Sequence, residues 1–133
     1  MNIFLNKKIL IYGLGKSGLS AFKFLKNKSD VFLYDDYHLK IQNLNIKKSI
    51  INYKNILKCE IDQIIWSTGI DINKCKLSKF LKKNNSKIYS DLDVFYSFYK
   101  NDCITITGTN GKSTTCQLMY KILSNQKFDV KLV

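Results

Sequence analysis

The chain has 133 residues, which is enough for one ordinary domain and part of a second. Its hydrophobic fraction of 45% is typical of a folded globular protein, and no apolar run approaches the roughly 20 residues that a membrane span needs. The N-terminus lacks the pattern of a secretory signal peptide, so we expect a cytoplasmic protein with no membrane span.

The net charge of +12 comes from 22 basic residues, all of them lysine. They are spread along the chain and form only short pairs such as Lys7-Lys8 and Lys82-Lys83. Dedicated nucleic-acid binders rely on Arg, whose planar fork contacts phosphates and base edges at two atoms. The composition therefore argues against a nucleic-acid partner, and a Lys-rich binding module remains only as an alternative.

In the first part of the chain, short apolar runs typical of buried strands alternate with segments whose apolar residues have helical spacing. This order favours an α/β fold with a Rossmann-like parallel sheet. In chain order we predict a strand at 8–12, a helix after the glycines to about 27, a strand at 31–34, a short helix at 38–43, strands at 49–52 and 62–67, a helix at 76–83, a strand at 87–89 and a helix from 90 or 91 to about 100.

The last part of the chain looks like the opening of a second, P-loop-type ATPase domain. A strand at 103–106, a glycine loop and a helix at 112–125 are followed by a further strand from 129. A nucleotide-binding sheet needs several more parallel strands than these. We therefore predict a Rossmann-like domain over residues 1–92 and an incomplete ATP-binding domain over 93–133.

The first glycine loop is Gly13-Leu14-Gly15-Lys16-Ser17-Gly18, a full GxGxxG between a strand and a helix. Such glycines permit a tight turn and bring a diphosphate close to the helix N-terminus. Asp35 follows about 20 residues later, where dinucleotide enzymes bind a ribose hydroxyl. The pattern predicts a phosphate-bearing ligand. An NAD-dependent oxidoreductase, an NAD-sensing domain and a turn required only for packing remain as alternatives.

The second loop is Thr107-Gly108-Thr109-Asn110-Gly111-Lys112-Ser113. It supplies backbone N–H groups for phosphates, a lysine for the terminal phosphates and a hydroxyl for magnesium. A standard Walker A loop would have glycine at position 106, where this chain has Ile106.

At these residues the chain resembles the Mur ligase family, the ATP-dependent amide ligases of peptidoglycan assembly, whose loop reads Thr-Gly-(Thr/Ser)-Asn-Gly-Lys-(Ser/Thr). The first loop, Asp35, the turn at 67–70 and the acidic helix start at 91–95 match in the same order. Thr68 replaces a proline of the family, and Tyr37 stands where a basic or polar residue often holds the uridine.

Within the family, the chain is most similar to the members that add D-glutamate to UDP-N-acetylmuramoyl-L-alanine. Sibling ligases remain an alternative. One of them, folylpolyglutamate synthase, shares the ATP loop but begins with its ATPase domain, whereas about a hundred residues precede the loop in this chain.

The resemblance implies ATP and Mg²⁺ as cofactors, UDP-N-acetylmuramoyl-L-alanine and D-glutamate as substrates, and an acyl phosphate intermediate. It also implies a cytoplasmic, monomeric full-length enzyme that serves cell wall biogenesis, cell shape and cell division. We expect the 133 residues alone to lack ligase activity.

The resemblance also implies two sets of binding residues. Those for ATP are Gly108, Thr109, Asn110, Gly111, Lys112, Ser113 and Thr114, with Lys112 catalytic and Ser113 on the metal. Those for the UDP substrate are Gly15, Lys16, Ser17, Gly18, Asp35, Asp36 and Gly69.

Overall fold

The structure is a computed structural model that describes residues 2–37, 44–67 and 69–132. The chain divides into two compact units, 1–100 and 101–133. The first unit extends to Lys100, and within it the helix that follows residue 90 packs on the first helix of the chain.

The first unit is built on a four-stranded parallel sheet in the order β2-β1-β3-β4. Strands β2 and β3 lie on opposite sides of β1, so the chain reverses its winding at the carboxyl end of β1. Ligands of α/β proteins bind at such reversal points. The strands are β1 (Lys8–Tyr12), β2 (Asp30–Tyr34), β3 (Gln63–Trp66) and β4 (Ile88–Tyr89).

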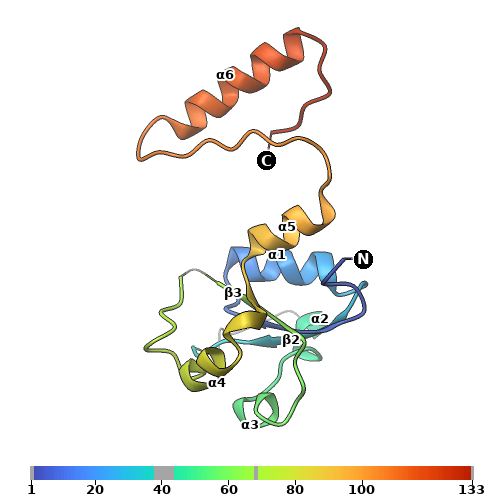
Figure 1. The fold of residues 1–133 in the computed structure, drawn as a ribbon, viewed down its shortest axis with the longest axis vertical. Helices are drawn as coiled ribbons and strands as arrows, with labels where there is room; N and C mark the ends of the chain where they lie inside the picture. Colours follow the sequence, from blue (N-terminus) through green and yellow to red (C-terminus); the bar gives the residue numbers. More distant parts are fainter. Residues whose placement is uncertain (1, 38–43, 68, 133) are drawn as a thin grey trace. The chain divides into compact units, whose positions relative to one another are not determined.

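Helices cover both faces of this sheet (Figure 1). Alternate residues of a strand point to opposite faces, so Ile9 and Ile11 enter one core while Leu10 and Tyr12 enter the other. Burial on both faces explains the near-continuous apolar run of β1. The parallel sheet with helices on both faces confirms the predicted α/β fold and is consistent with a Rossmann-like domain. The first core contains residues of α1 (Lys16–Leu25), α2 (Leu44–Lys47) and α5 (Asp91–Phe98), and the second those of α3 (Tyr53–Ile56) and α4 (Ser78–Lys83).

The predicted strands at 8–12, 31–34, 62–67 and 87–89 are confirmed, as are the helices that correspond to α1, α4 and α5. The strand expected at 49–52 is reduced to one bridge, between Leu33 and Ile50. The helix expected at 38–43 lies outside the described residues. Sequence reasoning missed α2, α3 and the 3-10 helix η1 (Asn85–Lys87), because elements of three or four residues are too short to show a period.

The second unit consists of an extended segment, a loop and helix α6 (Lys112–Asn125), which confirms the predicted helix. The strands expected at 103–106 and from 129 are absent from the described residues of this unit, so those two predictions were wrong. A strand exists only through hydrogen bonds to a neighbouring strand, and apolar composition alone cannot supply that neighbour. Consistently, α6 has no buried residue.

The glycine loop after β1 is shaped by close packing at two of its three glycines. Gly13 has φ +101°, and a Cβ added there would lie 2.7 Å from Ser67 Cβ. A Cβ on Gly18 would lie only 1.9 Å from the carbonyl oxygen of Gly13. Gly15, by contrast, has φ −70°, and no other atom lies within 4 Å of an added Cβ. The fold therefore requires Gly13 and Gly18, whereas it leaves space at Gly15.

We expect Gly18→Ala to lower the free energy of unfolding by about 2–4 kcal/mol, because the new methyl group meets backbone rather than a movable side chain. Gly15→Ala is the matched control and should cost less than about 1 kcal/mol. Urea titration followed by the fluorescence of Trp66, which lies in β3, measures both. Equal losses for the two variants would contradict this packing account.

Helix α5 begins with a reciprocal capping box. The Ser90 hydroxyl accepts a hydrogen bond from the Asp93 backbone N–H at 3.2 Å, and an Asp93 carboxylate oxygen accepts one from the Ser90 N–H at 2.7 Å. The Ser90 N–H, together with the Ser90 hydroxyl, lowers the pKa of Asp93 below its ordinary value. A depressed pKa in the folded state means that the ionised carboxylate stabilises the fold above the unfolded-state pKa.

We therefore expect Asp93→Asn to destabilise the first unit by about 0.5–1 kcal/mol at pH 7. The difference from the parent protein should vanish as the pH falls below the ordinary aspartate pKa of about 3.9 and through the lower folded-state value. Asp91→Asn is the control, because Asp91 lies in the same first turn without bonding the cap residue. Unfolding free energies measured from pH 7 to 2 test this, and a pH-independent difference would refute it.

Candidate functional site

The candidate site lies at the carboxyl ends of β1, β2 and β3, where the glycine loop leads into α1. Gly15 is the N-cap of α1, and no side chain caps this helix end. The first backbone bond within the helix runs from the Leu19 N–H to the Gly15 carbonyl at 3.0 Å. The N–H groups of the preceding turn therefore have no acceptor in the helix, and together with the helix dipole they favour an anion.

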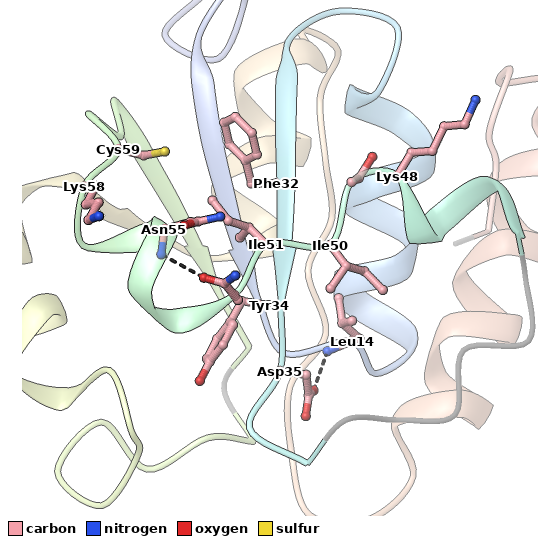
Figure 2. A pocket seen from close by; sticks show the side chains of 12 residues that line it. Leu14, Phe32, Tyr34, Asp35, Lys48, Ile50, Ile51, Asn55, Lys58 and Cys59 are labelled. Atoms are coloured by element: carbon pink, nitrogen blue, oxygen red, sulfur yellow. Dashed lines mark hydrogen bonds between the residues drawn. The ribbon is translucent and has the colours of Figure 1, made fainter.

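Asp35 holds the glycine loop in place. One of its carboxylate oxygens accepts a hydrogen bond from the Leu14 N–H at 2.9 Å, as Figure 2 shows. The other accepts one from the Tyr37 N–H, also at 2.9 Å. The structure thus brings Asp35 beside the loop of Gly15, Lys16, Ser17 and Gly18, as the sequence pattern predicts.

A pocket of about 600 Å³ lies next to Leu14 and Asp35 along the β2 edge (Figure 2). Its wall combines apolar and aromatic side chains with amides and two lysines. Sequence reasoning missed the contribution of residues 48–59, because this segment mixes polar and apolar residues without a clear period. The remaining lining residues are Phe32, Tyr34, Lys48, Ser49, Ile50, Ile51, Asn52, Asn55, Lys58 and Cys59.

The turn after β3 packs directly against the glycine loop. The Ser67 N–H donates to the Tyr12 carbonyl at 3.0 Å, and the Trp66 indole N–H donates to the Ile70 carbonyl at 3.1 Å. Ser67 and Ile70 also make the closest approaches to Gly13. Gly69, which the sequence places in the UDP site, is exposed in this turn, with no atom closer than 4.0 Å to an added Cβ.

Asp36 points away from Asp35 and into a different group of residues. One of its carboxylate oxygens accepts hydrogen bonds from the Tyr12 hydroxyl at 2.7 Å and from the Lys76 N–H at 3.0 Å. Burial, together with this carboxylate, raises the pKa of Tyr12 well above its ordinary value. The same two causes raise the pKa of Tyr34 to about 12. The two acidic residues at the end of β2 therefore have different partners.

The second predicted loop leads into α6 in the second unit. Gly108 and Gly111 have φ of +152° and +75°, and Gly111 is a left-handed N-cap without a side-chain cap bond. The Thr115 N–H is bonded to the Gly111 carbonyl at 2.9 Å, so the preceding N–H groups have no acceptor in the helix. The Lys112 ammonium donates to the carbonyls of Gly108 and Thr109.

These features fit the phosphates of a nucleotide. The predicted ATP-binding residues lie together in one loop and one helical turn, and an added Cβ at Gly111 meets no atom within 4 Å. Ser113 lies in the first turn of α6, where its hydroxyl suits a magnesium ion held by those phosphates.

A parallel sheet with a glycine loop at its reversal point, followed by a Gly-Lys-Ser loop at a helix start, is an arrangement typical of nucleotide-binding α/β proteins. No protein-family model matches the chain. Its relatives confirm the resemblance that the two loops predict: homologues covering nearly the whole chain are named UDP-N-acetylmuramoylalanine–D-glutamate ligase.

The relative from Rickettsia prowazekii is 38% identical over 97% of this chain, and that match covers 30% of the relative. The relative from Rickettsia felis is 36% identical over 97% of the chain and 29% of its own length. The relative from Aquifex aeolicus is 36% identical over 87% of the chain and 25% of its own length. The chain thus spans at most about a third of the length of these relatives.

Across the part of the chain that the structure describes, every helix is too short or too polar to cross a membrane.

Proposed function

We propose that this chain is the substrate-binding region and nucleotide loop of an ATP-dependent ligase that adds D-glutamate to UDP-N-acetylmuramoyl-L-alanine. The observation that carries the proposal is the sequence similarity to proteins with that name, which are 38% and 36% identical over 97% of this chain. The matched sequence contains both glycine loops. The match covers about 30% of these relatives, and we propose that the reaction also uses residues that lie outside the matched region. We extend the proposal to a cytoplasmic, monomeric enzyme of cell wall biogenesis.

The first unit would bind the UDP end of the substrate. Gly15, Lys16, Ser17 and Gly18 would face the diphosphate, because uncapped N–H groups and a positive helix end converge there. Asp35 and the pocket beside it would receive the nucleoside, whose flat base suits the aromatic wall. The exposed turn at Gly69 would lie against the sugar-phosphate part.

The second unit would begin the P-loop-type ATPase domain. The loop residues Gly108, Thr109, Asn110 and Gly111, with Thr114 in the first helical turn, would bind the phosphates of ATP through backbone N–H groups. Magnesium, when bound through Ser113, supplies positive charge at the phosphate oxygens. Lys112 would exchange its present contacts with the Gly108 and Thr109 carbonyls for the terminal phosphates.

In the proposed reaction, the terminal carboxylate of UDP-N-acetylmuramoyl-L-alanine attacks the γ-phosphorus of ATP, and ADP leaves. The amine of D-glutamate then attacks the carbonyl carbon of the acyl phosphate. Inorganic phosphate leaves, the nitrogen loses a proton, and an amide remains. Lys112 would stabilise charge on the transferring phosphoryl group, while the first unit would fix the position of the carboxylate.

The UDP half of the proposal predicts that the 133-residue chain binds UDP in calorimetry. Gly15→Val should weaken this binding at least about tenfold, because an isopropyl group would occupy the space above the helix N-terminus. The extended conformation of Gly15 accepts a β-branched residue, so the fold should survive. Ser20→Ala, an exposed change farther along α1, is the control. Tighter binding of NADH than of UDP would support the dinucleotide alternative instead.

The ATP half predicts that Lys112→Met weakens binding of a fluorescent ATP analogue in the presence of Mg²⁺ by about tenfold or more, since one charge-assisted contact to the phosphates is lost. Lys121→Met removes the same charge from an exposed position of the same helix and should change the affinity less than twofold, because an exposed remote charge is screened. Equal effects of the two variants would show that only net charge attracts the nucleotide.

A further inference from the structure

The carboxylate of Asp36 is held within the first unit through one of its two oxygens. One oxygen accepts the Tyr12 hydroxyl at 2.7 Å and the Lys76 N–H at 3.0 Å. The other oxygen is buried and has no hydrogen-bond partner among the described residues. The first oxygen has both its acceptor positions filled, and the second is out of reach of solvent. A ligand arriving from solvent therefore finds no oxygen of Asp36 to contact.

Asp35 differs in each of these respects. Its two oxygens each accept one backbone N–H, from Leu14 and from Tyr37, and each keeps acceptor capacity. It also lines the pocket beside the glycine loop, whereas Asp36 does not. Of the two adjacent acids, only Asp35 is placed to meet a ligand.

Asp36 instead joins the end of β2 to the segment that follows the Gly69 turn. The Lys76 ammonium also donates to the Asp36 carbonyl at 3.1 Å, so the two residues are joined by two contacts. Leu77, the next residue, is 1% exposed and packs in the core that contains Tyr12. The end of this segment is therefore held by one buried side chain and by Asp36.

The segment between the Gly69 turn and Lys76 is held together by short-range hydrogen bonds. Asp71 accepts two of these hydrogen bonds. Its carbonyl accepts the N–H of Cys75 at 3.1 Å, and its carboxylate accepts the N–H of Asn73 at 2.9 Å. At the other end, the Ile70 carbonyl accepts the Trp66 indole N–H. Short contacts thus run from Asp36 to the turn that packs on the glycine loop.

We propose that Asp36 is a positioning residue, which sets the turn at 67–70 against the Gly13–Gly18 loop without touching the ligand. The inference rests on the proposed function, because the site that it shapes is the proposed UDP site. It replaces the sequence-based expectation that Asp36 contacts the uridine. An asparagine in its place would put an amide group where the structure has a buried carboxylate oxygen without a hydrogen-bond partner, so even this isosteric change should loosen the segment.

The test measures UDP affinity and the reactivity of the Cys75 thiol in the same protein. Cys75 is half-buried within the restrained segment, and its thiol donates to the Ile72 carbonyl at 3.4 Å. The parent for these experiments is the full chain with Cys59→Ala, Cys103→Ser and Cys116→Ser. We expect Asp36→Asn to weaken UDP binding and to speed modification of Cys75 by a thiol reagent, each about three- to tenfold. Saturating UDP should slow that modification.

Three further variants isolate the role of Asp36. Asp35→Asn should weaken UDP binding and leave the Cys75 rate at the parent value. Tyr12→Phe removes one donor to Asp36 but keeps the ring in the core, so it should weaken UDP binding as Asp36→Asn does, to a smaller extent. Its Cys75 rate is not compared, because the Tyr12 hydroxyl also interacts with the Cys75 side chain. Lys74→Met, an exposed change within the segment, should alter neither measurement by more than about twofold.

Each outcome decides the inference. Weaker UDP binding with an unchanged Cys75 rate in Asp36→Asn would mean that Asp36 contacts the ligand directly. A faster Cys75 rate with unchanged UDP affinity would leave Asp36 a structural role only. A parent chain that binds no UDP would overturn the UDP half of the proposed function and the ligand part of this inference, while the Cys75 rate would still report whether Asp36 restrains the segment.

Discussion

The first unit depends on the contact between the start of α1 and the loop that follows β1. Gly18 lies so close to the Gly13 carbonyl that a side chain on it would require the backbone to move. This approach directs the N-terminal turn of α1 to the carboxyl end of the sheet. Gly13 has a positive φ and no side chain, and this allows Ser67 and Ile70 to pack on the loop. The glycine pattern is therefore a packing constraint first, and the proposed anion site is its consequence.

Gly15 separates the two roles that such a loop can have. Packing accounts fully for Gly13 and Gly18, and a glycine turn needed only for packing would have no reason to keep space at Gly15. The second loop uses the same physical device at the start of α6, again with no side-chain cap. In both units an uncapped helix N-terminus presents backbone donors and partial positive charge, which is the chemistry that phosphates require.

The sequence predicted what local chemistry determines. Three features are visible directly in the order of residues: the apolar run of β1, the GxGxxG spacing and the position of Asp35. The structure confirms the strands and the helix that they predict. Apolar composition at 103–106 resembles a strand, but strand formation depends on a partner elsewhere in space. The pocket wall at 48–59 and the short helices α2 and α3 show no regular spacing of apolar residues, so the sequence did not predict them. Neighbouring acids at a strand end look equivalent in sequence, yet Asp35 bonds the Leu14 N–H whereas Asp36 bonds Tyr12.

The central claim is that the carboxyl edge of this sheet binds a UDP-linked substrate. An NMR titration of the isotopically labelled chain with UDP-N-acetylmuramoyl-L-alanine tests it residue by residue. The account predicts that the backbone amide signals of residues 14–18, Asp35 and Gly69 shift together and saturate at one dissociation constant. It is contradicted if these amides stay unmoved while NADH shifts them, or if the UDP-linked substrate shifts only signals far from the glycine loop.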